Sequence, residues 1–256
     1  MRRRGCGSTT SPSTDSTSYA YDSADRLVSA TRGTTTTKAV YDAFGRRTTG
    51  VDGTTVAYYT GDTIRQVAKD SARTTWDLDV AGRQASITAE TKAADGIWST
   101  TSITTQHYRS GADTPAWGST TAGTAITVSR NVGDLTGGLS AVTSASGDAV
   151  LQLSNLHGDI SVRLPLASSA QPQVQRYDEY GAPDATTDTA RYGWLGTAAR
   201  TADAPGGLLM MGARSYAPAT GTFLQTDPVS GGGDNAYSHC SGDPINCTDT
   251  AGTFDY

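Results

Sequence analysis

Two neighbouring stretches share one design: "YAYDSADRLVSATRG" (residues 19–33) and "AVYDAFGRRTTGVDG" (residues 39–53). Each contains a Tyr-Asp pair, at 21–22 and 41–42, with an arginine four residues after the aspartate, and the second stretch begins 20 residues after the first. The Asp-x-x-Gly form at 42–45 predicts a tight turn, because the aspartate caps the backbone and glycine accepts a positive φ. The alternating residues after the turn indicate a returning strand, so each stretch is predicted to be a β-hairpin.

The same turn recurs along the chain, at Asp79–Arg83 and again at Asp178–Gly181. Between these turns, residues 124–166 alternate in polarity and contain Gly-Asp turns at 133–134, 147–148 and 158–159. A hairpin cannot bury its face alone, so successive units must stack side by side. We therefore predict an all-β fold in which these hairpins form one continuous, curved antiparallel sheet.

Composition supports this fold class and excludes some functions. The 256 residues suffice for one large domain or two small ones, and the 12 tyrosines far outnumber the 3 phenylalanines, which suits half-buried pleated surfaces. A net charge of −5 argues against a nucleic-acid partner bound through a basic field. No apolar run approaches the ~18 residues of a membrane span. Residues 1–18 are basic and then rich in Ser and Thr but lack the apolar stretch of an export signal, so we expect a disordered leader.

Two acidic turns stand close together near the end of the chain, in "TDPVSGGGDNAYSHCSGDPINCTDTAG" (residues 226–252). Asp227 and Asp249 each open a four-residue turn. Such aspartates are usually turn caps without chemistry, but two adjacent carboxylates can also act as a catalytic pair. A third acidic turn, Asp243-Pro244, is interpreted as structural, with the alternative that it supplies the second carboxylate.

The Tyr-Asp units resemble the YD or RHS repeats of large secreted and surface proteins. The segment from Arg191 onward resembles the RHS repeat-associated core domain, and together the two resemblances cover residues 19–256. The matching core pieces are "RYGWLGTAAR" (191–200), "GGLLMMGARSYAPATGTFLQTDPV" (206–229), "NAYSHCSGDPIN" (235–246) and "DTAG" (249–252). The resemblance implies a leader at 1–18, YD/RHS-type β repeats at 19–190 and a core domain at 191–256.

In that family the repeats spiral into a hollow β-cocoon, and the core domain plugs one end. Many members are aspartyl autoproteases that cut after the second acidic turn and free a toxin held inside the shell. The resemblance therefore assigns Asp227 and Asp249 as the catalytic carboxylates and places the cleaved bond near Thr253–Phe254. Two carboxyls that share a proton can serve as base and acid, and an intramolecular cut gains from positioning.

The resemblance also implies partners and a location. The partners are the chain's own upstream repeat shell and a C-terminal toxin, and the location is secreted or at the cell surface. The chain ends at Tyr256, three residues past the predicted cut, so the toxin is absent and we expect a truncated gene product or a fragment that stops at the cleavage boundary. No cofactor is expected.

Three residues depart from the family pattern. Ser230 stands where glycine is usual, Thr250 replaces a proline, and Thr226 replaces an arginine found in many cleaving members. The pair is thus predicted to be a protease site by descent, and whether this chain acts as an enzyme is left open. The alternative function is a non-catalytic structural or cell-surface-binding β-repeat protein, with carbohydrate among its candidate partners.

The remaining polar candidates lie around these turns. Arg214 could pair with the Asp227/Asp249 site, although an ordinary surface ion pair is the default expectation. Cys240 and Cys247, with His239 beside the first, fall short of the four ligands of a metal site, and a disulfide between the two cysteines is the alternative.

Other features are expected to be structural. His107 and His157 show no acidic or nucleophilic partner nearby and are predicted to be strand or turn residues. The apolar run Leu208–Met211 is predicted to begin a strand-turn-strand that seats the core domain against the shell. So few repeats cannot close a cocoon, which predicts an open sheet with exposed edges.

Overall fold

The structure is a computed structural model and describes residues 16–109, 111–167, 169–184, 190–229, 231 and 233–253. Residues 1–15 of the predicted leader lie outside this range. The first strand begins at Thr17, so residues 17 and 18, which were expected in the leader, belong to the folded part.

Most of the described strands form one sheet of thirteen strands, in the order β16 to β4. Its strands are β4 (Val40–Tyr41), β5 (Arg47–Thr49), β6 (Thr55–Tyr58), β7 (Ile64–Lys69), β8 (Ala72–Leu78), β9 (Gln84–Lys92), β10 (Trp98–Tyr108), β11 (Pro115–Ala122), β12 (Ala125–Gly133), β13 (Leu139–Ser144), β14 (Ala149–Ser154), β15 (Ile160–Pro165) and β16 (Gln173–Val174). Every neighbouring pair is antiparallel and consecutive in sequence, with β4 and β16 at opposite edges. The predicted all-β meander and its open edges are confirmed.

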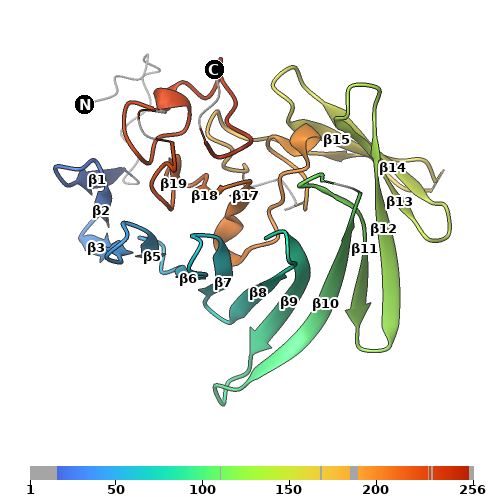
Figure 1. The fold of residues 1–256 in the computed structure, drawn as a ribbon, viewed down its shortest axis with the longest axis horizontal. Helices are drawn as coiled ribbons and strands as arrows, with labels where there is room; N and C mark the ends of the chain where they lie inside the picture. Colours follow the sequence, from blue (N-terminus) through green and yellow to red (C-terminus); the bar gives the residue numbers. More distant parts are fainter. Residues whose placement is uncertain are drawn as a thin grey trace.

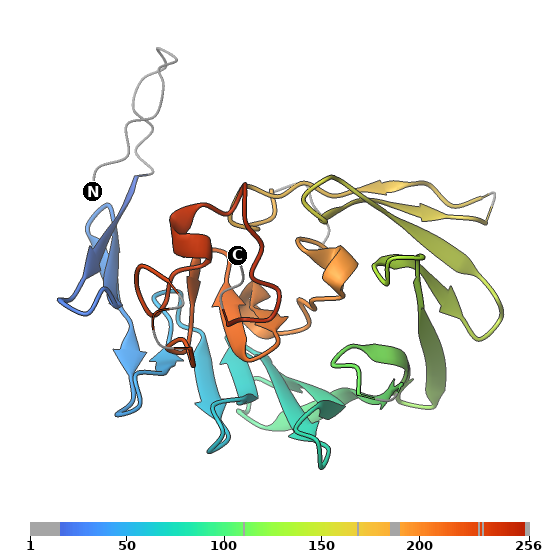
Figure 2. The ribbon, with the colours of Figure 1, turned by 45° about the horizontal axis from the view of Figure 1, so that its top comes forward.

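Two smaller sheets flank this one. The first holds β1 (Thr17–Tyr21), β2 (Leu27–Arg32) and β3 (Thr35–Lys38), and the second holds β17 (Leu209–Met211), β18 (Arg214–Ala217) and β19 (Thr222–Phe223). Three short 3-10 turns, η1 (Gly196–Ala198), η2 (Pro205–Gly207) and η3 (Cys240–Gly242), complete the described elements. The large sheet curls around the C-terminal segments, which lie on its concave side (Figure 1, Figure 2).

The prediction of one continuous sheet was wrong at a single junction. β3 pairs with β2 and β4 pairs with β5, while only Ala39 separates β3 from β4. One residue cannot form a hairpin turn, because the shortest common hairpin loops contain two. The chain therefore changes partner at Ala39, and β1–β3 form a separate sheet.

The turns follow the predicted chemistry. Asp42 Oδ1 accepts the backbone N–H groups of Phe44 and Arg46 at 2.9 and 3.0 Å, and Arg46 Nε binds Asp42 Oδ2 at 2.7 Å. Gly45 completes the turn at φ 78°. The Arg46 guanidinium then lies 4.9 Å from the ring centre of Tyr58 on β6, so the Asp and Arg of one turn also set the position of the next hairpin.

The same arrangement recurs at the next Asp-x-x-Gly-Arg turn. Asp79 binds the Arg83 side chain, whose guanidinium lies 4.4 Å from the ring centre of Tyr108 on β10. The repeat is therefore a structural unit that couples successive hairpins.

The C-terminal segment packs into the concave face at two places. The larger cluster joins apolar residues of β6 to β9, with Trp76 fully buried at its centre, to Leu208, Ala217 and Leu224. The smaller one joins Leu139 and Ile160 to Tyr192. The prediction that the Leu208–Met211 region seats the core segment against the sheet is confirmed.

Candidate functional site

Arg214, the first residue of β18, is the centre of the candidate site. Its side chain is 1 % exposed, and its Nη2 atom lies 2.9 Å from Asp227 Oδ2 and 3.0 Å from Asp249 Oδ2. Burial lowers the pKa of Arg214, and the two carboxylates oppose that shift. Two acidic groups thus face one buried guanidinium, and the expectation of a surface ion pair was wrong.

The rest of the Arg214 side chain holds the backbone of the C-terminal segment. Nε donates to the Gly252 carbonyl at 2.6 Å, Nη1 donates to the Ala236 carbonyl at 3.3 Å, and the guanidinium lies 3.7 Å from the ring centre of Phe223. A planar group with several fixed donors is suited to this arrangement, whereas a lysine is not.

The two carboxylates are turn caps and ion-pair partners at the same time. Asp249, fully buried, accepts the Thr253 N–H on Oδ1 at 3.0 Å and uses Oδ2 for Arg214. Asp227 accepts the Val229 N–H on Oδ1 at 2.8 Å, also leaving Oδ2 for Arg214. Its side chain is 8 % exposed, so water has access to Asp227 but not to Asp249.

The segment after Asp249 lies tightly against the turn between β17 and β18. The Ala213 N–H donates to the Ala251 carbonyl at 2.9 Å. Gly252 has φ 66°, and a Cβ there would collide with the Met211 carbonyl oxygen and lie 2.8 Å from the backbone nitrogen of Arg214. Only glycine fits this approach, which fixes residues 251–253 beside the two carboxylates.

His239 belongs to the site, although sequence reasoning considered it only as a metal ligand. It is 1 % exposed, and its Nε2 atom lies 3.5 Å from the backbone nitrogen of Asp249. Burial lowers the pKa of His239 to about 4, so the ring is neutral at pH 7 and can accept from that N–H. The rings of Trp194, Tyr216 and Phe223 surround it, with centres 5.3, 5.1 and 5.8 Å away. The only feature of the sequence that could have pointed to His239 as a site residue was its place inside the core-like motif.

A disulfide joins Cys240 to Cys247, with their Cα atoms 5.7 Å apart. The described residues contain no group of three or more side chains suited to a metal ion. Asp243 lies within the disulfide loop and accepts hydrogen bonds from the Asn246 side-chain amide at 2.9 and 3.0 Å, which agrees with its structural interpretation. Of the other site residues, Thr253 is described, whereas Phe254 and Ser230 lie outside the described range.

The other two histidines are placed as strand and turn residues. His107 lies on β10 and stacks on Trp117, with ring centres 3.6 Å apart. His157 lies in the turn between β14 and β15, where its Nδ1 atom is 3.0 Å from Asp159 Oδ1. The expectation that His157 lacks a nearby acidic partner was therefore wrong, because this turn brings side chains two residues apart together.

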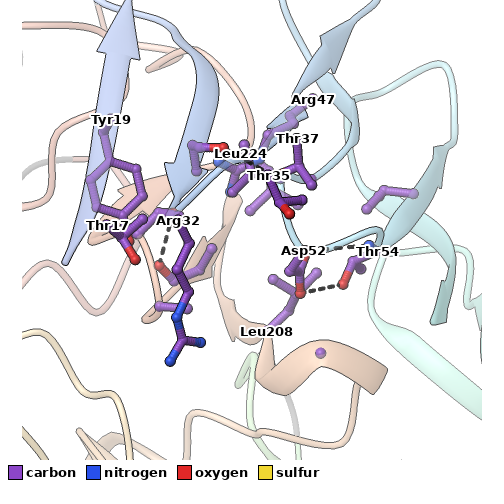
Figure 3. Close-up of a pocket in the computed structure, with 18 residues that line it drawn as sticks. Thr17, Tyr19, Arg32, Thr35, Thr37, Arg47, Asp52, Thr54, Leu208 and Leu224 are labelled. Atoms are coloured by element: carbon purple, nitrogen blue, oxygen red, sulfur yellow. Dashed lines mark hydrogen bonds between the residues drawn. The ribbon is translucent and has the colours of Figure 1, made fainter. Parts of the chain in front are cut away.

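A cavity of about 440 Å³ opens between β1–β3, β5 and residues 206–224 of the C-terminal segment. Tyr19, Arg32 and Leu208 are among its lining residues (Figure 3). Its walls are mainly threonine and aliphatic side chains. Neither Asp227 nor Asp249 lines this cavity.

Comparison with known proteins shows the fold. No family model matches the sequence, and no curated protein matches it. Among solved structures, 34 chains match. The crystal structures of TcdB2-TccC3-TEV and of TcdB2-TccC3 both superpose with a TM-score of 0.65, at 19% and 20% identity, and each match covers 92% of this chain. The crystal structure of TcdB2-TccC3 without its hypervariable C-terminal region gives 0.63 at 19% identity.

This chain spans 13% of the length of each of these matched chains. The likeness shows that this chain shares its all-β fold with part of these structures. No helix among the described residues is long and apolar enough to cross a membrane.

Proposed function

We propose that the chain is the C-terminal part of an RHS-type shell whose core domain cuts its own polypeptide next to Thr253. In this proposal the upstream repeats enclose a C-terminal toxin segment, in a protein that is secreted or displayed at the cell surface. The presence of a hypervariable C-terminal region in TcdB2-TccC3 supports a variable cargo after the core. Residues 191–256 act as the core and residues 19–190 as the repeat shell.

The observation that carries the proposal is the position of the C-terminal segment. Arg214 holds both carboxylates and the Gly252 carbonyl, and Asp249 accepts the Thr253 N–H, so the chain to be cut is already bound beside the acidic pair. Holding a reacting group in place removes much of the entropic barrier of a bimolecular reaction.

The exposures of the two carboxylates suggest their roles. Asp227, which water can reach, takes a proton from a water molecule that attacks the Thr253 carbonyl carbon. Asp249, in its protonated form, gives its proton to the amine of residue 254 as the peptide bond breaks. Arg214 stabilises the carboxylate that remains ionised. The reaction is a single turnover, because the substrate is the chain itself.

One observation favours a second function without chemistry. The Arg214 guanidinium stands between the two carboxylates, an arrangement that neutralises them as a buried anchor. In that case the cluster only fastens the C-terminal segment into the plug, and the protein is a structural or cell-surface-binding β-repeat protein.

A cleavage assay distinguishes the two proposed functions. The chain is extended beyond Tyr256 by a folded tag, and release is followed by denaturing electrophoresis and by mass spectrometry of the new terminus. Asp227→Asn and Asp249→Asn are compared with Asp243→Asn, which alters an exposed acidic turn of the same core.

Under the protease proposal the unaltered chain and Asp243→Asn lose the tag near residue 253, while the two site variants keep it. Circular dichroism is used to check that the site variants fold like the unaltered chain. A tag that stays attached to the folded, unaltered chain refutes the protease proposal. The second function, in which the cluster only anchors the C-terminal segment, then remains.

A further inference from the structure

The disulfide connects the two chain segments that meet at the acidic site. Cys240 directly follows His239, and Cys247 precedes Asp249 by two residues. Because His239 Nε2 lies 3.5 Å from the Asp249 backbone nitrogen, the covalent link closes immediately beside this contact. The disulfide thus holds the Asp249 turn against the buried imidazole.

The loop that the disulfide closes also contacts the rest of the shell. Tyr180 Oη donates to the Gly242 carbonyl at 3.2 Å. The closed loop therefore joins the turn at residues 178–181 to the acidic site.

The two cysteines differ in their exposure to solvent. Cys240 is 3 % exposed, whereas Cys247 is half-buried, and most residues between them are exposed. Thiol–disulfide exchange begins with attack by a thiolate on one sulfur, so the attack is directed to Cys247.

We propose that the Cys240–Cys247 disulfide is a thiol-sensitive clamp on the acidic site. The oxidised clamp keeps Asp249 and residues 250–253 bound at Arg214, and reduction by a cellular thiol such as glutathione or a protein dithiol loosens this segment. The clamp regulates the site of the proposed function, but its effect on the fold does not depend on cleavage.

The chemistry is an ordinary exchange. A reductant thiolate attacks the Cys247 sulfur, the disulfide bond breaks, and Cys240 leaves as a thiolate that takes a proton from water. A second reductant thiol attacks the mixed disulfide, releasing Cys247 as a thiol and leaving the reductant oxidised as a disulfide. Two electrons pass to the protein in the whole sequence.

Two backbone amides report on the clamp. The Ala213 N–H donates to the Ala251 carbonyl, and the Thr253 N–H donates to Asp249. Hydrogen exchange at both is measured by NMR in the 256-residue chain carrying Cys6→Ser, oxidised and then reduced with dithiothreitol. Alkylation and mass spectrometry verify the state of both remaining cysteines. The amides of β7 and β8, in the large sheet, serve as the internal reference.

We expect reduction to accelerate exchange at the two reporter amides at least about tenfold more than at the reference amides. A Cys240→Ser/Cys247→Ser chain should exchange at the fast rate with or without dithiothreitol. If that variant does not fold, reduction of the folded protein alone decides the question.

Unchanged exchange after verified reduction overturns the clamp. So does an equal loss of protection throughout the sheet, which would mean that the disulfide holds the whole fold. A chain that never releases a C-terminal tag but loosens on reduction would support the clamp while refuting the protease.

Discussion

Replacing Arg214 with methionine tests whether the buried cluster depends on this guanidinium. The change keeps an unbranched apolar stem but leaves two nearly buried carboxylates without their shared cation. Removing one partner of a buried ion pair typically costs about 3–5 kcal/mol, because an uncompensated charge stays in a poorly solvated site. The Gly252 carbonyl also loses its 2.6 Å hydrogen bond.

We therefore expect Arg214→Met to lower the free energy of unfolding by about 4 kcal/mol at pH 7. At ~2–4 °C per kcal/mol for a chain of this size, the melting temperature should fall by about 8–16 °C. Urea unfolding followed by fluorescence of the buried Trp76 and Trp194 provides the measurement.

Arg200→Met is the matched control. Arg200 also binds an aspartate through two nitrogens, both 3.1 Å from Asp113 Oδ2, but the Asp113 side chain is 61 % exposed. Such pairs contribute about 1 kcal/mol or less. A loss for Arg214→Met no larger than for Arg200→Met would refute the reasoning.

Three further predictions concern other contacts. Gly252→Ala should lower the free energy of unfolding by about 1–3 kcal/mol through strain at positive φ and a backbone collision, measured by urea titration against the unaltered chain. Removing the Cys240–Cys247 link by a double serine substitution should cost about 2.5 kcal/mol, the loop-closure value for a loop of this length, and a cost near zero would contradict it. Hydrogen bonding to Asp159 raises the pKa of His157, so this contribution to stability is complete below the unfolded value of 6.5 and disappears as the pH rises through the folded value. His157→Gln should remove that pH-dependent part of the melting temperature, and an unchanged profile would rule out the contribution.

The repeat region was largely predictable because its information is local. Asp42, Gly45 and Arg46 meet within one turn, and the hydrogen bonds that join them depend on neighbouring residues alone. Period-two alternation then predicts the strands between such turns. The break at Ala39 was also readable in principle, since a one-residue connection excludes a hairpin.

The acidic pair could be located from the sequence, but its surroundings could not. Spacing alone left Asp227 and Asp249 as ordinary turns, and the motif resemblance nominated them together. That Arg214 would be buried and would face both carboxylates depends on how β18 packs under two loops more than ten residues away. No local pattern encodes that packing, and the same is true of the aromatic surroundings of His239.

By itself, the sequence determined the all-β class, the positions of the repeat turns and the core-like motif. These depend on backbone preferences and side-chain contacts within a few residues. Only the tertiary structure decided which charges share a buried space, that the C-terminal segment is held beside Asp249, and that the disulfide closes against His239. Burial determines the energy of a charge, and burial is a property of the whole packed chain.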